Sequence, residues 1–187
     1  MKNLKNAVFL IILVILTSCK SEVPQNLKFT IIQLNDVYEI SPIQGGKYGG
    51  MARVETLHKK LLEENPNTLL VLAGDFLNPS LLGTIKVNGE RVRGKQMVEV
   101  MNAMNFDLVA FGNHEFDLSY ENLQNRLNES NFEWVCSNVY HNLNGEKKSF
   151  GKIIEGKKKD INQTYIKEFK VGSETIKIGF ISVCIPS

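Results

Sequence analysis

The stretch from Asp107 to Asp117, D-L-V-A-F-G-N-H-E-F-D, constrains the fold more than any other part of this chain. Its uninterrupted apolar run, residues 108–111, is typical of a strand that is buried on both faces of a parallel sheet. The run stops at Gly112 and polar residues follow at once, so they lie at the carboxyl end of that strand. In open α/β sheets ligands bind at this edge, because the loops that leave the strands line a common crevice.

The rest of the chain alternates strands with helices. Strands are predicted at residues 27–34, 68–73 and 132–139, and helices at residues 51–64, 97–104 and 120–127. This alternation predicts an α/β fold with right-handed crossovers between parallel strands. Asn88-Gly89 predicts a small hairpin, residues 140–163 an exposed loop, and residues 165–185 a second hairpin.

The composition is that of one ordinary globular domain, with 187 residues, 43% of them hydrophobic and 22% charged. A net charge of +2 gives no argument for a nucleic acid polymer as a partner. The basic run from Lys157 to Lys159 is predicted to be a solvated loop. Cys136 and Cys184 lie in apolar stretches and are expected to be small buried side chains, and whether they pair stays open.

The first nineteen residues have the pattern of a secretory signal. Two lysines precede an apolar run at residues 7–16, which is shorter than the roughly 20 residues that span a bilayer. Leu16-Thr17-Ser18-Cys19 then resembles the lipobox of bacterial lipoproteins, in which Cys19 would carry a lipid anchor in the membrane. We therefore expect a signal at residues 1–19, a tether at residues 20–26 and a location in the bacterial cell envelope. Lys20 favours the outer membrane, and an ordinary signal peptide with an incidental cysteine is the alternative.

Polar residues follow three successive predicted strands, namely Asn35-Asp36, Gly74-Asp75 and Gly112-Asn113-His114. Because the carboxyl ends of parallel strands meet at one rim, two carboxylates, an amide and an imidazole should converge there. Hard oxygen ligands with an imidazole suit a divalent cation such as magnesium, manganese, iron or zinc. The alternative is that each polar residue only caps the turn that follows its strand.

The same motifs resemble those of a known family. N-D-V-Y-E-I at residues 35–40, G-D-F-L-N-P-S at 74–80 and F-G-N-H-E-F-D at 111–117 are similar to the first three blocks of calcineurin-like metallophosphoesterases. Within that family they resemble the amino-terminal domain of the 5′-nucleotidase group. The resemblance implies the amino-terminal portion of a four-layer α/β/β/α fold at residues 27–187. It also implies two divalent metal ions, with manganese, zinc, iron, magnesium and calcium all open.

The resemblance gives each polar residue a role. Asp36 would bind the first metal ion, Asp75 would bridge both, and Asn113 would bind the second. His114 would contact the phosphoryl group, and Asp117 would orient and charge its imidazole. The implied reaction is the metal-dependent hydrolysis of phosphate esters, nucleotides in particular, outside the cytoplasm.

Two departures from the family pattern limit this prediction. Tyr38 stands where most relatives have a histidine ligand, and it either binds metal poorly or packs as an aromatic ring beneath the loop. The later Gly-His and Gly-His-x-His or Gly-His-x-Gln blocks do not occur in these residues. His58, expected at the surface or boundary of a helix, and His141, expected in a loop, do not replace them.

We therefore expect an incomplete part of a catalytic domain. By itself it should bind metal weakly and have little or no phosphatase activity. The alternative is a catalytically inactive, truncated lipoprotein or binding module that retains the fold.

Overall fold

The computed structural model describes residues 27–171 and 174–185, so the predicted signal, the lipid anchor at Cys19 and the tether lie outside the described residues. The chain forms two compact units. The larger one contains residues 28–167 and 178–187, and the smaller one includes residues 168–177. Within the smaller unit, Lys177 Nζ lies 2.9 Å from Glu168 Oε1.

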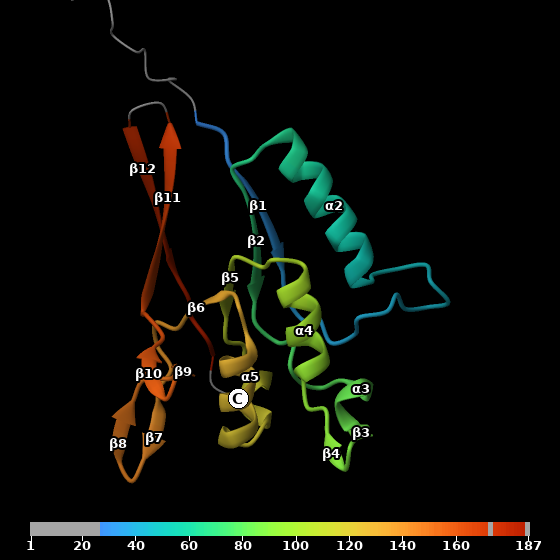
Figure 1. Ribbon diagram of the computed structural model, residues 1–187, viewed down its shortest axis with the longest axis vertical. Coiled ribbons are helices and arrows are strands. Elements are labelled where there is room, and N and C mark those ends of the chain that lie inside the picture. Colours follow the sequence, from blue (N-terminus) through green and yellow to red (C-terminus); the bar gives the residue numbers. More distant parts are fainter. Residues whose placement is uncertain (1–26, 172–173, 186–187) are drawn as a thin grey trace, which may run out of the picture. The chain divides into compact units, whose positions relative to one another are not determined.

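The larger unit is built on a four-stranded parallel sheet (Figure 1). Its strands are β1 (Thr30–Leu34), β2 (Thr68–Ala73), β5 (Leu108–Ala110) and β6 (Glu133–Val135), in the order β1-β2-β5-β6. The crossovers contain α2 (Met51–Glu64), α4 (Lys95–Ala103) and α5 (Tyr120–Glu129). Ser119 caps α5 by accepting a hydrogen bond from the backbone N–H of Asn122, as a serine at this position favours. The predicted α/β architecture is therefore confirmed.

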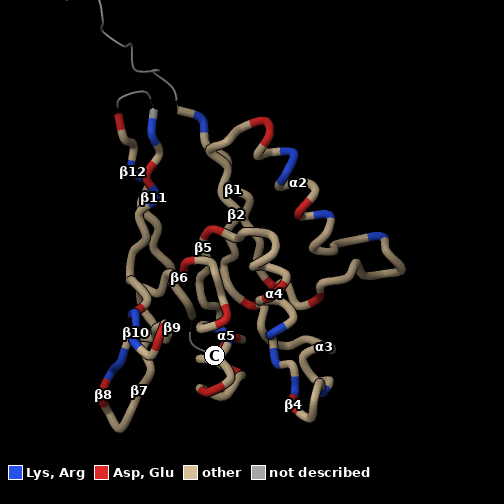
Figure 2. Tube along the Cα trace, viewed as in Figure 1, with Lys and Arg blue, Asp and Glu red and all other residues tan. Residues whose placement is uncertain are grey.

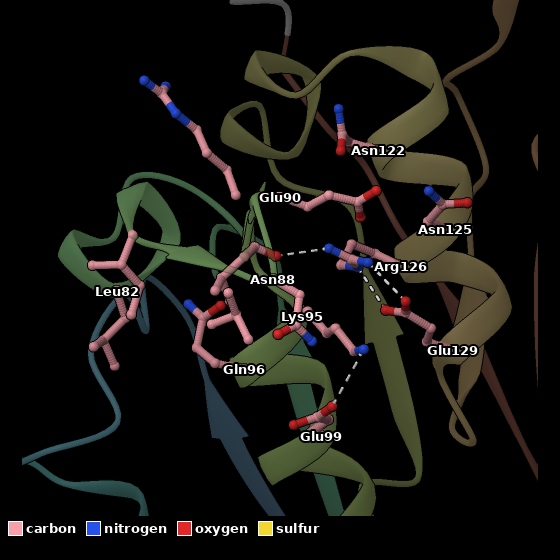
Figure 3. Close-up of a pocket in the computed structure, with 14 residues that line it drawn as sticks. Leu82, Asn88, Glu90, Lys95, Gln96, Glu99, Asn122, Asn125, Arg126 and Glu129 are labelled. Carbon is pink, nitrogen blue, oxygen red and sulfur yellow. Dashed lines mark hydrogen bonds and ion pairs between the residues drawn. The ribbon is translucent and has the colours of Figure 1, made fainter.

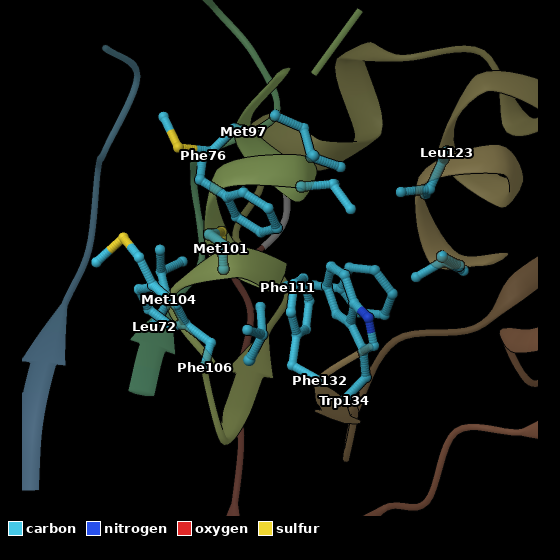
Figure 4. Packing of buried hydrophobic residues seen from close by; sticks show 14 of the residues in the cluster. Leu72, Phe76, Met97, Met101, Met104, Phe106, Phe111, Leu123, Phe132 and Trp134 are labelled. Atoms are coloured by element: carbon cyan, nitrogen blue, oxygen red, sulfur yellow. The ribbon is translucent and has the colours of Figure 1, made fainter. Parts of the chain in front are cut away.

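The hydrophobic core lies between the helices and one face of the sheet, and Figure 4 shows its packing. Side chains of α4 and α5, including Met97, Met101 and Leu123, pack with the sheet and with Phe111 and Trp134. The rings of Phe111 and Trp134 lie 4.8 Å apart. The core reaches the carboxyl ends of the strands, because Phe76 and Leu77, directly after β2, are 0% and 1% exposed. Buried side chains therefore fix the loop that carries Asp75.

The other face of the sheet is covered only in part. Ile31 and Gln33 of β1 are exposed, and a hollow of 240 Å³ lies between this face and the segment 180–182. Leu108 and Val109 of β5 are buried at 5% and 0% exposure, as predicted for a strand covered on both faces. The edge strand β1 alternates instead, because only its inward side meets the helices.

Helix α2 turns only part of its predicted apolar face to the core, against which Val54 packs. Leu57 and Leu62 are 50% and 39% exposed, whereas His58 is only 5% exposed. The expectation of a surface or boundary histidine is therefore wrong. The helix begins with the buried Met51, and position 58 lies two turns later on the same side.

Residues 140–163 form two hairpins and not the predicted loop. β7 (His141–Leu143) pairs with β8 (Glu146–Lys148), and β9 (Gly151–Ile154) pairs with β10 (Lys157–Asp160). Asn144-Gly145 and Glu155-Gly156 all have positive φ, which is the geometry of tight hairpin turns. The strands carry few apolar residues, so periodicity did not reveal them. The lysine run lies in β10, whose four residues are exposed.

The two predicted hairpins are present. A short helix, α3 (Leu81–Thr84), precedes β3 (Lys86–Val87) and β4 (Glu90–Arg91), which pair around Asn88-Gly89. β11 (Thr164–Val171) and β12 (Glu174–Ile181) form the second pair. Within residues 27–171 and 174–185, no helix has the length and apolar character needed to cross a membrane.

The packing can be tested at Leu127, which is 0% exposed in α5. Leu127→Ala removes buried methyl groups and leaves a cavity, so we expect the free energy of unfolding to fall by about 2–5 kcal/mol. Leu57→Ala, the same change at a 50% exposed helix position, should cost less than about 1 kcal/mol. Urea denaturation followed by circular dichroism measures both, and equal losses would contradict this description of the core.

Candidate metal centre

The carboxyl ends of β1, β2 and β5 bring the predicted site residues to one rim. The backbone N–H of Asp36 donates to the carbonyl of Gly74, with the nitrogen and oxygen 3.2 Å apart. The backbone N–H of His114 donates to Asp75 Oδ1 at 2.8 Å. Asp36, Asp75 and the Asn113-His114 pair are therefore neighbours, as the positions of the strand ends predict.

Two glycines allow this close approach. A Cβ atom on Gly74 would lie 2.2 Å from the backbone nitrogen of Gly112, and a Cβ atom on Gly112 would lie 2.2 Å from Asp75 Oδ1. Gly74 also has a φ of +85°, which L side chains rarely adopt. The turns after β2 and β5 can therefore touch only because neither glycine has a side chain.

Both aspartates of the rim have left-handed backbone conformations. Asp36 has a φ of 56° and Asp75 a φ of 63°. This region is uncommon for residues other than glycine, although aspartate adopts it more readily than most. Such conformations persist where the surrounding structure holds them, and they cluster at functional sites. The surrounding contacts therefore fix where each carboxylate leaves its strand.

Glu115 makes four of these contacts; it lies within the F-G-N-H-E-F-D motif, but no role is predicted for it from the sequence. Its side chain is 0% exposed and accepts hydrogen bonds from the backbone N–H groups of Asp75 (2.8 Å), Phe76 (2.8 Å), Leu77 (3.1 Å) and Gly112 (2.7 Å). Burial raises the pKa of this carboxyl, and the four N–H donors act in the opposite direction. Glu115 thereby joins the turn after β2 to the turn after β5. Its partners are main-chain groups, so no residue pattern marks it.

His114 and Asp117 form the predicted pair. His114 Nδ1 lies 2.8 Å from Asp117 Oδ2, and the same oxygen accepts a hydrogen bond from the side chain of Asn78 at 3.1 Å. The hydrogen bond between the two side chains raises the pKa of His114 and lowers the pKa of Asp117. The pair thus favours a positively charged imidazole beside the rim.

Tyr38 contacts the first aspartate. Its hydroxyl donates to Asp36 Oδ1 at 2.9 Å, and its ring meets the ring of His114 edge-on with the centroids 6.1 Å apart. Hydrogen bonds from Asn35 and then from Tyr38 lower the pKa of Asp36. Burial is the larger cause that raises the pKa of Tyr38, and the hydrogen bond to Asp36 raises it further. A phenol that stays protonated is a hydrogen-bond donor, so this arrangement supports a positioning role for Tyr38.

The remaining histidines and cysteines lie in other settings. His58 Nδ1 lies 3.3 Å from Glu55 Oε2. His141 lies in strand β7 and stacks on Tyr120 at 4.0 Å, which corrects the expectation of a loop position. Cys136 is buried, as expected, and Cys184 is half-buried; both are free thiols.

The donor set suits a hard divalent cation but is small. Asp36, Asp75 and Asn113 offer carboxylate and amide oxygens, which magnesium, manganese and calcium prefer. Within the part of the chain that the structure describes, no group of three or more histidine, cysteine, aspartate or glutamate side chains could hold a metal ion. The residues present therefore fit part of a metal site.

Comparison with known proteins places this geometry in a family. The family model described as calcineurin-like phosphoesterase matches residues 29–174. The chain therefore belongs to the calcineurin-like phosphoesterase family, whose members are hydrolases that use divalent metal ions.

Its relatives include nucleotide-hydrolysing proteins. The chain is 31% identical over 143 residues to the trifunctional nucleotide phosphoesterase protein YfkN of Bacillus subtilis (strain 168), a match that covers 73% of this chain and 9% of that protein. It is 34% identical over 92 residues to human 5′-nucleotidase, covering 49% of this chain and 15% of the relative. The structure of a 5′-nucleotidase precursor from Thermus thermophilus superposes with a TM-score of 0.61 at 25% identity, covering 84% of this chain and 29% of that one. The chain thus spans a minor part of these relatives.

The role of Glu115 can be tested with Glu115→Gln. A glutamine keeps the shape but loses the charge and turns an N–H donor toward backbone N–H groups, so we expect a loss of about 2–5 kcal/mol in unfolding free energy. Glu121→Gln, on the exposed first turn of α5, should change stability by less than about 0.5 kcal/mol. Denaturant titration measures both variants, and a neutral Glu115→Gln would contradict the role of this carboxylate.

The charge state of His114 gives a second test. In metal-free buffer its pKa should lie above the ordinary histidine value, because Asp117 stabilises the imidazolium. Asp117→Asn removes that negative charge, so the pKa of His114 should fall. A titration of the histidine ring signals by NMR measures the shift, and the exposed Asp160→Asn serves as the control. An unchanged His114 pKa in Asp117→Asn would contradict the pairing.

Proposed function

We propose that this chain carries part of the catalytic centre of a metal-dependent phosphoesterase that hydrolyses nucleotides outside the cytoplasm. The observation that supports it is the meeting of Asp36, Asp75, Asn113 and His114 at the ends of adjacent parallel strands. Membership of the calcineurin-like phosphoesterase family supports phosphate ester hydrolysis as the reaction. The names of the relatives from Bacillus subtilis and from human support nucleotides as the substrate class.

Each residue has a distinct part in the proposed reaction. Asp36, Asp75 and Asn113 would hold divalent metal ions, which neutralise phosphate charge and lower the pKa of a bound water. His114 would donate a hydrogen bond from Nε2 to a phosphoryl or leaving oxygen while its Nδ1–H stays on Asp117. Asp117 keeps the imidazole charged and oriented, and Glu115 keeps the two turns in place.

We further propose that the protein is held at the bacterial cell envelope. The support is the sequence of residues 1–19, with its basic start, apolar run and Leu16-Thr17-Ser18-Cys19 motif. A lipid on Cys19 and a tether at residues 20–26 would leave the domain outside the cytoplasm. Mass spectrometry of the envelope-derived protein tests this, because a diacylglycerol on Cys19 supports the anchor and an unmodified cysteine contradicts it.

A non-catalytic binding module is the second candidate. It is supported by the small donor set of the described residues and by the hydrogen bond that Tyr38 makes to Asp36, at a position where the family resemblance leads us to expect a histidine. Coding sequence that continues past codon 187 with the Gly-His and Gly-His-x-His or Gly-His-x-Gln blocks would support the enzyme. A verified stop codon there would support the binding module.

Manganese binding tests the proposed metal residues. We expect weak binding by the 187-residue chain, measured by electron paramagnetic resonance of free Mn²⁺, because Asp36, Asp75 and Asn113 provide too few ligands for tight coordination. Asp75→Asn should weaken binding by more than about tenfold, the size of effect typical for disturbed metal sites. Asp160→Asn, which changes an exposed residue of β10, should bind like the unaltered chain. Equal binding by Asp75→Asn would contradict the site.

An assay of phosphate release tests whether the 187-residue chain forms a working catalytic centre by itself. With Mn²⁺ and a nucleoside 5′-monophosphate, we expect little or no turnover by the 187-residue chain, because its described residues supply only part of a metal site. Metal-dependent turnover that Asp75→Asn abolishes would show that these residues form a working centre by themselves, contrary to this expectation.

A further inference from the structure

The segment from Leu81 to Lys95, containing α3 and the β3–β4 hairpin, exposes several apolar side chains next to the rim. Leu81 is 76% exposed, Ile85 48% and Val87 56%, and Leu82 is 36% exposed. We call this segment the apolar tip. It follows directly from the loop of Asp75 and Asn78, and the backbone N–H of Leu81 donates to Glu39 Oε1 at 3.2 Å. An exposed cluster of this kind marks an interaction surface.

The apolar tip is also basic. It contains Lys86, Arg91, Arg93 and Lys95 against a single acidic residue, Glu90. Among the described residues, the side chains of Lys86, Arg91 and Arg93 form no ion pair, and Lys95 lies 3.9 Å from Glu99. Figure 2 shows these basic positions gathered along β4 and the start of α4. The apolar side chains are thus flanked by uncompensated positive charge.

A buried arginine holds the tip in place. Arg126 of α5 is 6% exposed and donates to the backbone carbonyls of Val92 and Arg93 at 2.9 and 3.0 Å. Its guanidinium also bonds both carboxylate oxygens of Glu129 at 2.7 Å (Figure 3). The hollow of 710 Å³ beside the tip is lined by this satisfied pair and by Arg91 and Glu90 of the tip. Leu82, Ile85 and Val87 also line this hollow, whereas the exposed Leu81 and Lys86 do not and therefore face away from it.

A second basic region lies at the same end of the larger unit. The β7–β8 and β9–β10 hairpins carry Lys147, Lys148 and the run 157–159, together with Ile153 and Ile154, which are 46% and 50% exposed. In Figures 1 and 2 the turns of β3–β4 and β7–β8 both lie at the lower end of the view. In this second region Lys148, Lys158 and Lys159 pair with Glu146, Asp160 and Glu133, so Lys147 and Lys157 carry its remaining positive charge.

We propose that the apolar tip docks on an anionic phospholipid bilayer, with the β7–β10 lysines as a second contact. Aliphatic side chains match the acyl region, and lysine and arginine match anionic headgroups, a combination typical of surfaces that lie on membranes. The tip has no aromatic residue, so it lacks the stacking groups that single-stranded nucleic acid binding uses. This proposal does not depend on the phosphoesterase activity or on a lipid at Cys19.

A local fluorescence reporter tests it. Leu81→Trp places an indole at the tip, while the single native tryptophan, Trp134, is 3% exposed and gives a constant background. On adding phosphatidylglycerol vesicles, the emission of Leu81→Trp should shift to shorter wavelength, and the shift should be much smaller with phosphatidylcholine vesicles. Raising salt from about 0.1 M to 1 M should also reduce it, because the screening length falls from ~10 to ~3 Å. The double change Lys86→Glu with Arg91→Glu should reduce it as well.

Leu57→Trp is the matched control, because Leu57 is an exposed leucine on α2. This local readout is needed since the apolar run at residues 7–16 can bind vesicles by itself. Equal shifts at positions 57 and 81, or equal shifts with neutral and anionic vesicles, would overturn the proposal. No shift with either vesicle would also overturn it and would indicate a protein partner for the tip.

Discussion

The buried carboxylate of Glu115 is the interaction on which the candidate site depends. It accepts four backbone hydrogen bonds, three from residues 75–77 after β2 and one from Gly112 after β5. A buried charge is costly unless such donors surround it, so the folded turns and the carboxylate require one another. Three contacts fix the position of Asp75. Its backbone N–H donates to Glu115, its side chain accepts from the backbone N–H of His114, and Gly74 beside it touches Gly112.

The parallel sheet and the residues at its rim could be predicted, because apolar strands that stop at polar residues are a strong signal. The three strand exits at Asp36, Asp75 and Asn113 are visible in the sequence, and the structure brings them together. Glu115 could not be assigned a partner, since its partners are N–H groups that every sequence has. The pairing of His114 with Asp117, expected from the family resemblance, is present at 2.8 Å.

Two predictions are wrong, the loop at residues 140–163 and the surface position of His58, and each has a physical reason. The hairpin strands of residues 141–160 contain few apolar residues and none at a regular spacing of two, so the sequence pattern does not reveal strands that are held by turns and backbone pairing. Helix α2 begins at Met51 as predicted, and Met51, Val54 and His58 form its inward stripe, so Leu57 and Leu62 fall on either side of that stripe. The sequence of residues 1–26 supports an envelope anchor, but those residues lie outside the described structure.

We propose that Asp36, Asp75 and Asn113 form a divalent metal site at the rim of the parallel sheet. Anomalous diffraction from crystals of the chain grown with Mn²⁺ would locate the bound ion. We expect an anomalous peak within coordination distance, roughly 2–2.6 Å, of the Asp75 carboxylate and of an oxygen of Asp36 or Asn113. Manganese peaks elsewhere in the crystal with none at this rim would contradict it.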